Sequence, residues 1–241
     1  MKCLFPICDV EAHSFAFLPS TKDARMYVLL CRGEALVVDP NRSKAAINLL
    51  KQRGIKQLTI LLTHEHYDHT CGINLLREHF SCTVVCSVGC AERICDSRKN
   101  LSYYCSAISE AERCRMSDND QNELTPFSAE ADRTFTGVMT LPFAGHSLVL
   151  TETFGHSRGS LCALMDGKVL FSGDSLVMGV PVVTRLPGGS IKEFQRITLP
   201  YLQALPADTW VMPGHHDAGE LSVLLQSRGE WKNANQQDPR N

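Results

Sequence analysis

The chain has 241 residues, which is enough for one large domain or two small ones. Its 24 Lys and Arg residues nearly balance its 26 Asp and Glu residues, so the formal net charge of -2 disfavours a nucleic-acid partner. Hydrophobic residues make up 44% and charged residues 21% of the chain, a composition that excludes wholesale disorder. No apolar run approaches the ~18 residues of a membrane-spanning helix, so no membrane partner is expected.

The N-terminus does not resemble a signal peptide. Pro6 interrupts a short apolar stretch, and the acidic residues Asp9 and Glu11 follow directly, so a cytoplasmic protein is expected. The eleven cysteines are odd in number, which disfavours a full disulfide framework and favours reduced thiols that behave as small apolar side chains. The cysteine group at 82–95 contains no C-x-x-C pair, which disfavours a thiolate metal site there.

The first part of the chain alternates apolar strand patterns with helical patterns. Arg32-Gly33 is typical of a hairpin turn, Ser43 of a helix N-cap and Gly54 of a helix end. Strands are predicted at 13–18, 25–31, 35–39, 57–63 and 83–87, and helices at 43–53, 70–80 and 89–95. This alternation favours an α/β layered fold.

The middle of the chain is polar, and strand patterns return after it. An insertion of helices and loops is predicted at 96–132, with helices around 103–116 and a loop at 117–123. Further strands are predicted at 134–141, 147–154, 160–165, 168–172 and 208–212, and helices at 190–205 and 218–226. Pro200 is expected to kink or split its helix, and the polar tail at 229–241 is expected to be flexible.

A dense group of metal-ligand side chains follows the predicted strand at 57–63. His64, Glu65, His66, Asp68 and His69 place three imidazoles and two carboxylates within six residues. Imidazole nitrogen and carboxylate oxygen are ligands that zinc and iron accept. His64 and His66 can point the same way in an extended segment, while Asp68 and His69 can face a second position, so one loop can serve two metals.

Three later positions can complete a ligand set for two metals. His156, Asp174 and His215 each follow a glycine directly, and each lies at the end of a predicted strand. A glycine allows the backbone to turn tightly and to approach a metal closely. We therefore expect these three side chains to join the loop at 64–69.

These motifs resemble the metallo-β-lactamase superfamily. The resemblance runs from Asp39, in Val37-Val38-Asp39-Pro40, to about Glu220, and includes Gly155-His156-Ser157, Gly173-Asp174 and Gly214-His215 in the same order. Within the superfamily the chain most resembles the glyoxalase-II-like hydrolases, with weaker similarity at 98–102, 131–134 and 187–190. The resemblance implies a four-layer αβ/βα sandwich, formed here by a single domain over residues 1–228.

The resemblance also implies a role for each residue. Asp39 would lie behind the ligands, where its hydrogen bonds would orient the ligand loop. The first metal would be held by His64, His66 and His156, the second by Asp68, His69 and His215, and Asp174 would bridge both. Two divalent ions are therefore expected, with zinc as the first choice and iron or manganese as alternatives.

Such a site can supply a nucleophile without a serine or cysteine. Two divalent ions, two carboxylates and a bridging hydroxide sum to a charge of about +1, and bound water then ionises at a pKa of ~7. The sequence therefore predicts a hydrolase in which a metal-bridging hydroxide attacks a small ester, thioester or related acyl substrate. Asp68 and Asp174 are the predicted catalytic carboxylates.

Two other functions stay open at this point. One is a persulfide dioxygenase of the same fold, which uses a single iron, and the other is a small-molecule phosphodiesterase. Val177 stands where lactonases of the superfamily have tyrosine, which disfavours a lactone. Only residues 216–241 follow His215, where glyoxalase II has a long helical domain, so a glutathione thioester is disfavoured as the substrate. The expected partners are a small-molecule substrate and a second copy of the chain in a homodimer.

Overall fold

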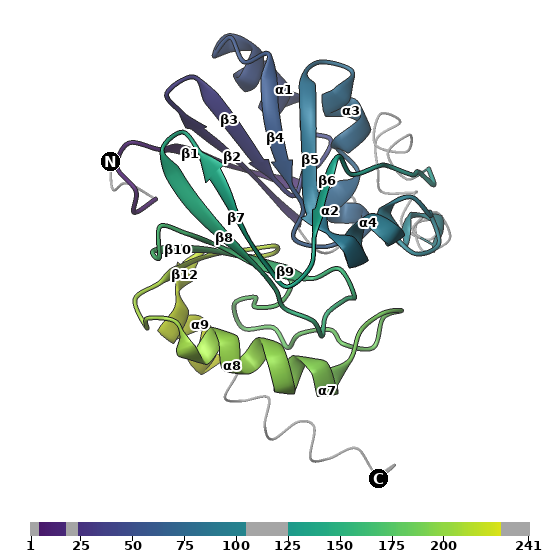
Figure 1. The fold of residues 1–241 in the computed structure, drawn as a ribbon, viewed down its shortest axis with the longest axis vertical. Coiled ribbons are helices and arrows are strands. Elements are labelled where there is room, and N and C mark those ends of the chain that lie inside the picture. Colours follow the sequence, from purple (N-terminus) through teal and green to yellow (C-terminus); the bar gives the residue numbers. More distant parts are fainter. Residues whose placement is uncertain (1–4, 18–23, 105–124, 228–241) are drawn as a thin grey trace.

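The computed structural model describes residues 5–17, 24–104 and 125–227, which build a sandwich of two six-stranded sheets (Figure 1). Helices cover the outer face of each sheet, so the layers run helix, sheet, sheet, helix. This arrangement confirms the four-layer αβ/βα sandwich. Within the described ranges, no helix combines the length and the apolar character that crossing a membrane requires.

The first sheet has the order β1-β2-β3-β4-β5-β6. Its first three strands are antiparallel, whereas β4, β5 and β6 continue parallel to β3. The strands are β1 (Glu11–Phe17), β2 (Ala24–Cys31), β3 (Glu34–Val38), β4 (Gln57–Leu61), β5 (Ser81–Ser87) and β6 (Arg133–Phe135). Helices between these strands include α1 (Lys44–Gln52), α2 (Tyr67–Thr70), α3 (Ile73–Arg77) and α4 (Val88–Ile94). Parallel neighbours need crossover connections, and these helices provide them.

The second sheet has the order β12-β11-β10-β9-β8-β7 and is antiparallel except between β10 and β11. Its strands are β7 (Val138–Phe143), β8 (His146–Glu152), β9 (Leu161–Met165), β10 (Val169–Gly173), β11 (Trp210–Pro213) and β12 (Gly219–Glu220). The helical segments are α7 (Ile191–Glu193), η3 (Phe194–Thr198), α8 (Leu199–Ala204) and α9 (Leu221–Ser227). Because β8, β10 and β11 run in one direction, the segments that follow them leave the sheet at the same edge.

Among the described residues, three large buried apolar clusters separate the four layers. The strand β2 contributes side chains to two of these clusters, because successive side chains of a strand point to opposite faces of the sheet. Leu29 enters the core between the two sheets, whereas Val28 contacts the layer of α1, α3 and α4. The third cluster lies between the second sheet and the helices α8 and α9, and includes Leu202 and Leu224.

The helix predicted at 70–80 is wrong in its extent. The chain forms two short helices instead, α2 and α3, with Cys71 and Gly72 between them. The backbone N–H of Gly72 donates to the carbonyl of Pro40 at 2.9 Å, a contact outside the helix. This tertiary hydrogen bond turns the chain between α2 and α3.

The strand predicted at 134–141 is also wrong, because it contains two strands that belong to different sheets. β6 ends the first sheet, and β7 begins the second sheet after a turn. Gly137 adopts a φ of +72° in this turn, a conformation that glycine reaches at little cost. The chain therefore changes sheets at this residue.

Pro200 does interrupt the regular helix expected at 190–205. The helical segments α7, η3 and α8 follow one another directly, and the N–H of Leu199 donates to the carbonyl of Phe194, five residues earlier. Proline has no N–H, and wider turns of this kind accommodate the missing hydrogen bond. The tail at 229–241 and residues 105–124 of the expected insertion lie outside the described residues.

Candidate metal centre

All seven side chains predicted as metal ligands come from segments that follow strands at one edge of the sandwich. Residues 64–69 follow β4 in the first sheet, whereas the other three follow β8, β10 and β11 in the second. Two backbone hydrogen bonds connect the sheets here, from Leu161 N to Thr63 O at 2.8 Å and from Arg25 N to Gly214 O at 2.7 Å. Ligands far apart in sequence therefore meet where the two sheets are tied together.

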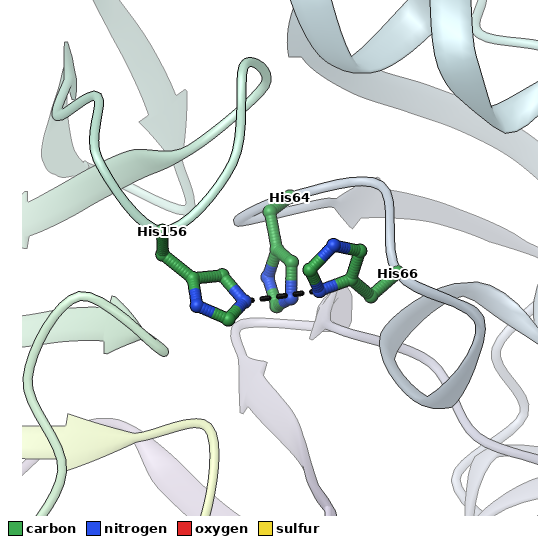
Figure 2. Close-up of side chains that lie close together, drawn as sticks. All are labelled: His64, His66 and His156. Atoms are coloured by element: carbon green, nitrogen blue, oxygen red, sulfur yellow. Dashed lines mark hydrogen bonds between the residues drawn. The ribbon is translucent and has the colours of Figure 1, made fainter. Parts of the chain in front are cut away.

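The first group of candidate ligands consists of three buried histidines. Figure 2 shows the rings of His64 and His66, from the loop after β4, facing the ring of His156 from the loop after β8. Nε2 of His156 lies 2.9 Å from Nδ1 of His66. One ring nitrogen of each histidine lies within 4.8 Å of the others, close enough for a single ion to contact all three.

The second group consists of Asp68, His69 and His215. Nε2 of His69 lies 3.3 Å from Nε2 of His215. Oδ2 of Asp68 lies 3.7 Å from the His69 nitrogen and 3.5 Å from the His215 nitrogen. The three candidate ligand atoms again lie within 4.8 Å of one another, so this group can surround a second ion.

Asp174 lies between the two groups. Its Oδ1 is 3.5 Å from Nε2 of His69, and its Oδ2 is 3.5 Å from Nε2 of His156 and 3.5 Å from Nε2 of His215. A Cβ on Gly214 would lie 2.4 Å from Asp174 Oδ1, so only glycine allows the carboxylate to take this place. One carboxylate therefore faces both groups.

Asp39 lies behind the second group and is buried. Its Oδ1 accepts a hydrogen bond from Thr63 N at 2.7 Å, and its Oδ2 accepts one from Thr63 Oγ1 at 2.6 Å. Nδ1 of His69 lies 3.1 Å from Asp39 Oδ2 and can only donate to an ionised carboxylate. Asp39 thereby fixes the ring of His69 with Nε2 toward His215, the arrangement expected of a carboxylate that orients a ligand histidine.

The two groups differ in their electrostatics. Burial, together with the neighbouring imidazoles, holds the pKa values of His64 and His66 well below the usual range, so both rings are neutral. Burial opposes a charge on His69, but Asp68, Asp174 and Asp39 outweigh it and raise the pKa to about 10. For Asp174, burial opposes ionisation, yet His215, His69 and His156 hold its pKa well below the usual range.

A divalent cation fits both groups. Among the described residues, several buried side-chain atoms in this cluster have no hydrogen-bond partner: Nε2 of His64, Nε2 of His66, Nδ1 of His215 and Oδ1 of Asp174. Unpaired buried polar atoms are costly, and they gather where a metal or ordered water completes a site. Imidazole nitrogens and carboxylate oxygens are also the donor set that zinc, iron and manganese accept.

Glu65 lies in the loop that the sequence singled out, but its supporting role was not predicted. Its carboxylate is fully buried and accepts hydrogen bonds from Arg93 Nε at 2.6 Å, Ser157 Oγ at 2.7 Å and Gly159 N at 3.1 Å. It therefore ties the ligand loop after β4 to α4 and to the loop that carries His156. Its position between two histidines could have indicated this role. Alternate residues of an extended segment point to opposite sides, so Glu65 points away from the histidines.

Comparison with known families identifies a match over most of the chain. A profile described as the metallo-beta-lactamase superfamily matches residues 24–215, which include all seven candidate ligands and Asp39. The chain is 29% identical over 205 residues to a "Probable metallo-hydrolase YqgX" of Bacillus subtilis, covering 84% of this chain and 89% of that protein.

Two further similarities bear on the branch and on the fold. The chain is 28% identical over 212 residues to a "Hydroxyacylglutathione hydrolase" of Tolumonas auensis, covering 87% of this chain and 68% of that protein. The crystal structure of BLEG-1 B3 metallo-beta-lactamase superposes with a TM-score of 0.74 at 25% identity, covering 90% of this chain and 97% of that one. The chain thus spans about two thirds of the hydroxyacylglutathione hydrolase and nearly all of the other two proteins.

Proposed function

Because the chain belongs to the metallo-β-lactamase superfamily, we propose that it is a metal-dependent hydrolase of a small ester, thioester or related acyl substrate. The placement of Asp174 carries the proposal. Its two oxygens lie 3.5 Å from His69 in one ligand group and 3.5 Å from His156 in the other, as a carboxylate shared by two ions requires. The similarity to a hydroxyacylglutathione hydrolase supports acyl chemistry.

The proposed centre divides the work between its two groups. His64, His66 and His156 offer neutral nitrogen donors to one cation, while Asp68, His69 and His215 surround the other. Two divalent ions, of which zinc suits the donor set, would acidify water to a pKa of about 7 and stabilise negative charge on the substrate acyl oxygen. No serine or cysteine nucleophile is then required.

One carboxylate of the centre would transfer protons, and another would balance the charge of the cations. Asp68 is partly exposed and lies within 3.7 Å of both His69 and His215, so it can accept a proton at the edge of the centre and pass it to solvent. Asp174 stays ionised beside three histidines and balances cationic charge on both sides. Asp39 positions His69 and does not contact the reacting atoms.

We also propose a substrate class, a location and an oligomeric state for the enzyme. The expected substrate is a small molecule and not a nucleic acid, because the net charge of -2 gives the chain no overall basic character. We further propose a cytoplasmic enzyme that works as a homodimer.

Metal content and turnover should be measured together on purified protein. The substrate panel contains S-lactoylglutathione, an aryl ester, a lactone, a bis-aryl phosphodiester, and glutathione persulfide with oxygen uptake. We expect two divalent ions per chain, cleavage of an ester or thioester, and loss of both the activity and at least one ion in His66→Ala. His79→Ala is the matched control, because His79 is exposed and lies outside the centre.

Other outcomes would overturn the proposal. One iron per chain with oxygen uptake on persulfide would identify a dioxygenase. Cleavage restricted to the phosphodiester would identify a phosphodiesterase. Full ester cleavage by His66→Ala would place the chemistry elsewhere in the protein.

A further inference from the structure

A second cluster of ligand-type side chains lies away from the candidate metal centre. It contains Asp9, which precedes β1, Cys31, the last residue of β2, and His146, the first residue of β8. One candidate ligand atom of each residue lies within 4.8 Å of the others. The residues are widely separated in sequence, so only the folded chain brings them together.

The two clusters occupy opposite ends of the sandwich. At one end of β2, Ala24 pairs with His215 of the candidate centre, and at the other end stands Cys31. Seven steps along a strand at ~3.3 Å each span about 23 Å. The two clusters therefore cannot share an ion or a substrate.

The geometry of the second cluster suits a tetrahedral ion. Cys31 Sγ lies 3.8 Å from His146 Nε2, and Asp9 Oδ2 lies 3.3 Å from the same nitrogen. Tetrahedral zinc with bonds of about 2.0–2.3 Å places neighbouring ligand atoms roughly 3.3–3.6 Å apart. The observed separations are close to these edges, so an ion can enter with small side-chain movements.

His146 is also held in the orientation that a ligand histidine needs. Its Nδ1 lies 2.6 Å from Asp166 Oδ2, and Asp166 is fixed in turn by Ser147 N, which donates to its Oδ1 at 2.9 Å. Metal-bound histidines commonly donate their other ring N–H to a carboxylate in this way. Nε2 is thereby left to face the sulfur of Cys31 and the carboxylate of Asp9.

We propose that Asp9, Cys31 and His146 form a zinc-type divalent metal site that joins the segment before β1 to the ends of β2 and β8. Cys31 is 4% exposed, which shields the sulfur, while the half-exposed Asp9 leaves a path for the ion to enter. On binding, the S–H bond of Cys31 breaks, a sulfur–metal bond forms, and the proton passes to solvent. The thiolate and Asp9 then balance the two charges of the ion.

A competing arrangement exists in the absence of metal. A protonated His146 can pair with both Asp9 and Asp166, and the Arg32 guanidinium also lies 3.3 Å from Asp9 Oδ2. That arrangement gives the sulfur of Cys31 no role, although the sulfur faces the same ring nitrogen. The presence or absence of a metal–sulfur bond therefore distinguishes the two.

Cobalt titration of the metal-stripped full chain provides the test. Thiolate-bound Co²⁺ gives charge-transfer absorption in the near ultraviolet, and the candidate centre cannot produce this band because its ligands are histidine and aspartate. Because the candidate centre takes up two further ions, we expect the band to be complete only when three equivalents of cobalt per chain have been added. We also expect it to persist in His66→Ala and to disappear in Cys31→Ser. Cys8→Ser and Cys95→Ser are matched controls, because both thiols are exposed and both variants should keep the band.

Two surface variants keep the test valid if Cys31→Ser does not fold. Asp9→Asn should weaken cobalt binding at this band at least tenfold, and Asp166→Asn should weaken it about 10–100-fold because it no longer orients His146. The proposal is overturned if wild-type protein gives no thiolate band. It is also overturned if the band survives Cys31→Ser, or if Asp9→Asn binds cobalt as tightly as the wild type.

Discussion

Arg93 Nε donates to the carboxylate of Glu65 at 2.6 Å, in an ion pair enclosed between α4 and the ligand loop after β4. The Glu65 side chain is 0% exposed and that of Arg93 is 16% exposed. Removal of one partner from a buried ion pair leaves an unpaired charge in a medium of low dielectric constant. This pair is therefore more than a surface contact.

Arg93→Ala should lower the free energy of unfolding by about 3 kcal/mol, because it leaves Glu65 charged and buried. Arg77→Ala is the matched control. It removes a pair with Asp132 of similar length, 2.7 Å, whose side chains are 30% and 43% exposed, and should cost about 1 kcal/mol or less. Urea unfolding at constant zinc concentration measures the free energy of unfolding of both variants. An equal decrease in the two variants would contradict the prediction.

Asp39→Asn should weaken metal binding about 10–100-fold and reduce kcat, because an amide cannot accept hydrogen bonds from both Thr63 and His69 through two equivalent oxygens. Asparagine tolerates the φ of 51° at this position, so the backbone should be unaffected. Competition with a chelating dye measures the affinity. Asp208→Asn, at an exposed position, is the control, and unchanged affinity in Asp39→Asn would show that its hydrogen bonds do not position the ligand loop.

Metal removal should lower the thermal stability of the wild type. At a free metal concentration about 1,000 times Kd, binding contributes about 4 kcal/mol, which corresponds to roughly 10 °C in Tm for a chain of this size. The difference between metal-loaded and chelator-treated protein should be smaller in His66→Ala, which lacks one ligand of the first group, whereas His79→Ala should keep the full difference. Differential scanning calorimetry supplies the measurement, and a wild type insensitive to the chelator would speak against a metal-stabilised centre.

The thiol of Cys82 should lose its proton only at a high pH. Burial is the main cause that raises the pKa of its thiol to about 11, with Asp132 adding to the effect and Arg77 opposing it. Because the pKa is raised, only roughly one part in a thousand of the thiol is ionised to the reactive thiolate at pH 8. This fraction increases about tenfold with each pH unit.

Alkylation of the Cys82 peptide, followed by mass spectrometry, should therefore still accelerate between pH 9.5 and 10.5. A free cysteine standard, with its pKa near ~8.5, should have levelled off by then. Circular dichroism at each pH shows that the chain remains folded. A Cys82 profile that follows the standard would exclude the raised pKa.

Local sequence spacing predicted most of the secondary structure and its order. The apolar periodicities from Ala24 to Gln52 match β2, β3 and α1 within a few residues, because side-chain direction within one element depends on that element alone. The boundaries failed where a distant partner intervened. The hydrogen bond from Gly72 to Pro40 divided one expected helix, and the turn at Gly137 assigned one expected strand to two sheets.

The candidate ligands could also be picked out in the sequence, since His64, His66, Asp68 and His69 lie in one loop and the later candidates follow glycines at strand ends. Spacing alone could not show that Asp174 faces both groups, a role that only the family resemblance implied, and nothing in the sequence indicated that Glu65 anchors the loop. Nor did the sequence show that Cys31 and His146 meet. Those relationships depend on the order of strands in the two sheets and on how the sheets pack, and these are decided by burial and hydrogen bonding summed over the whole chain.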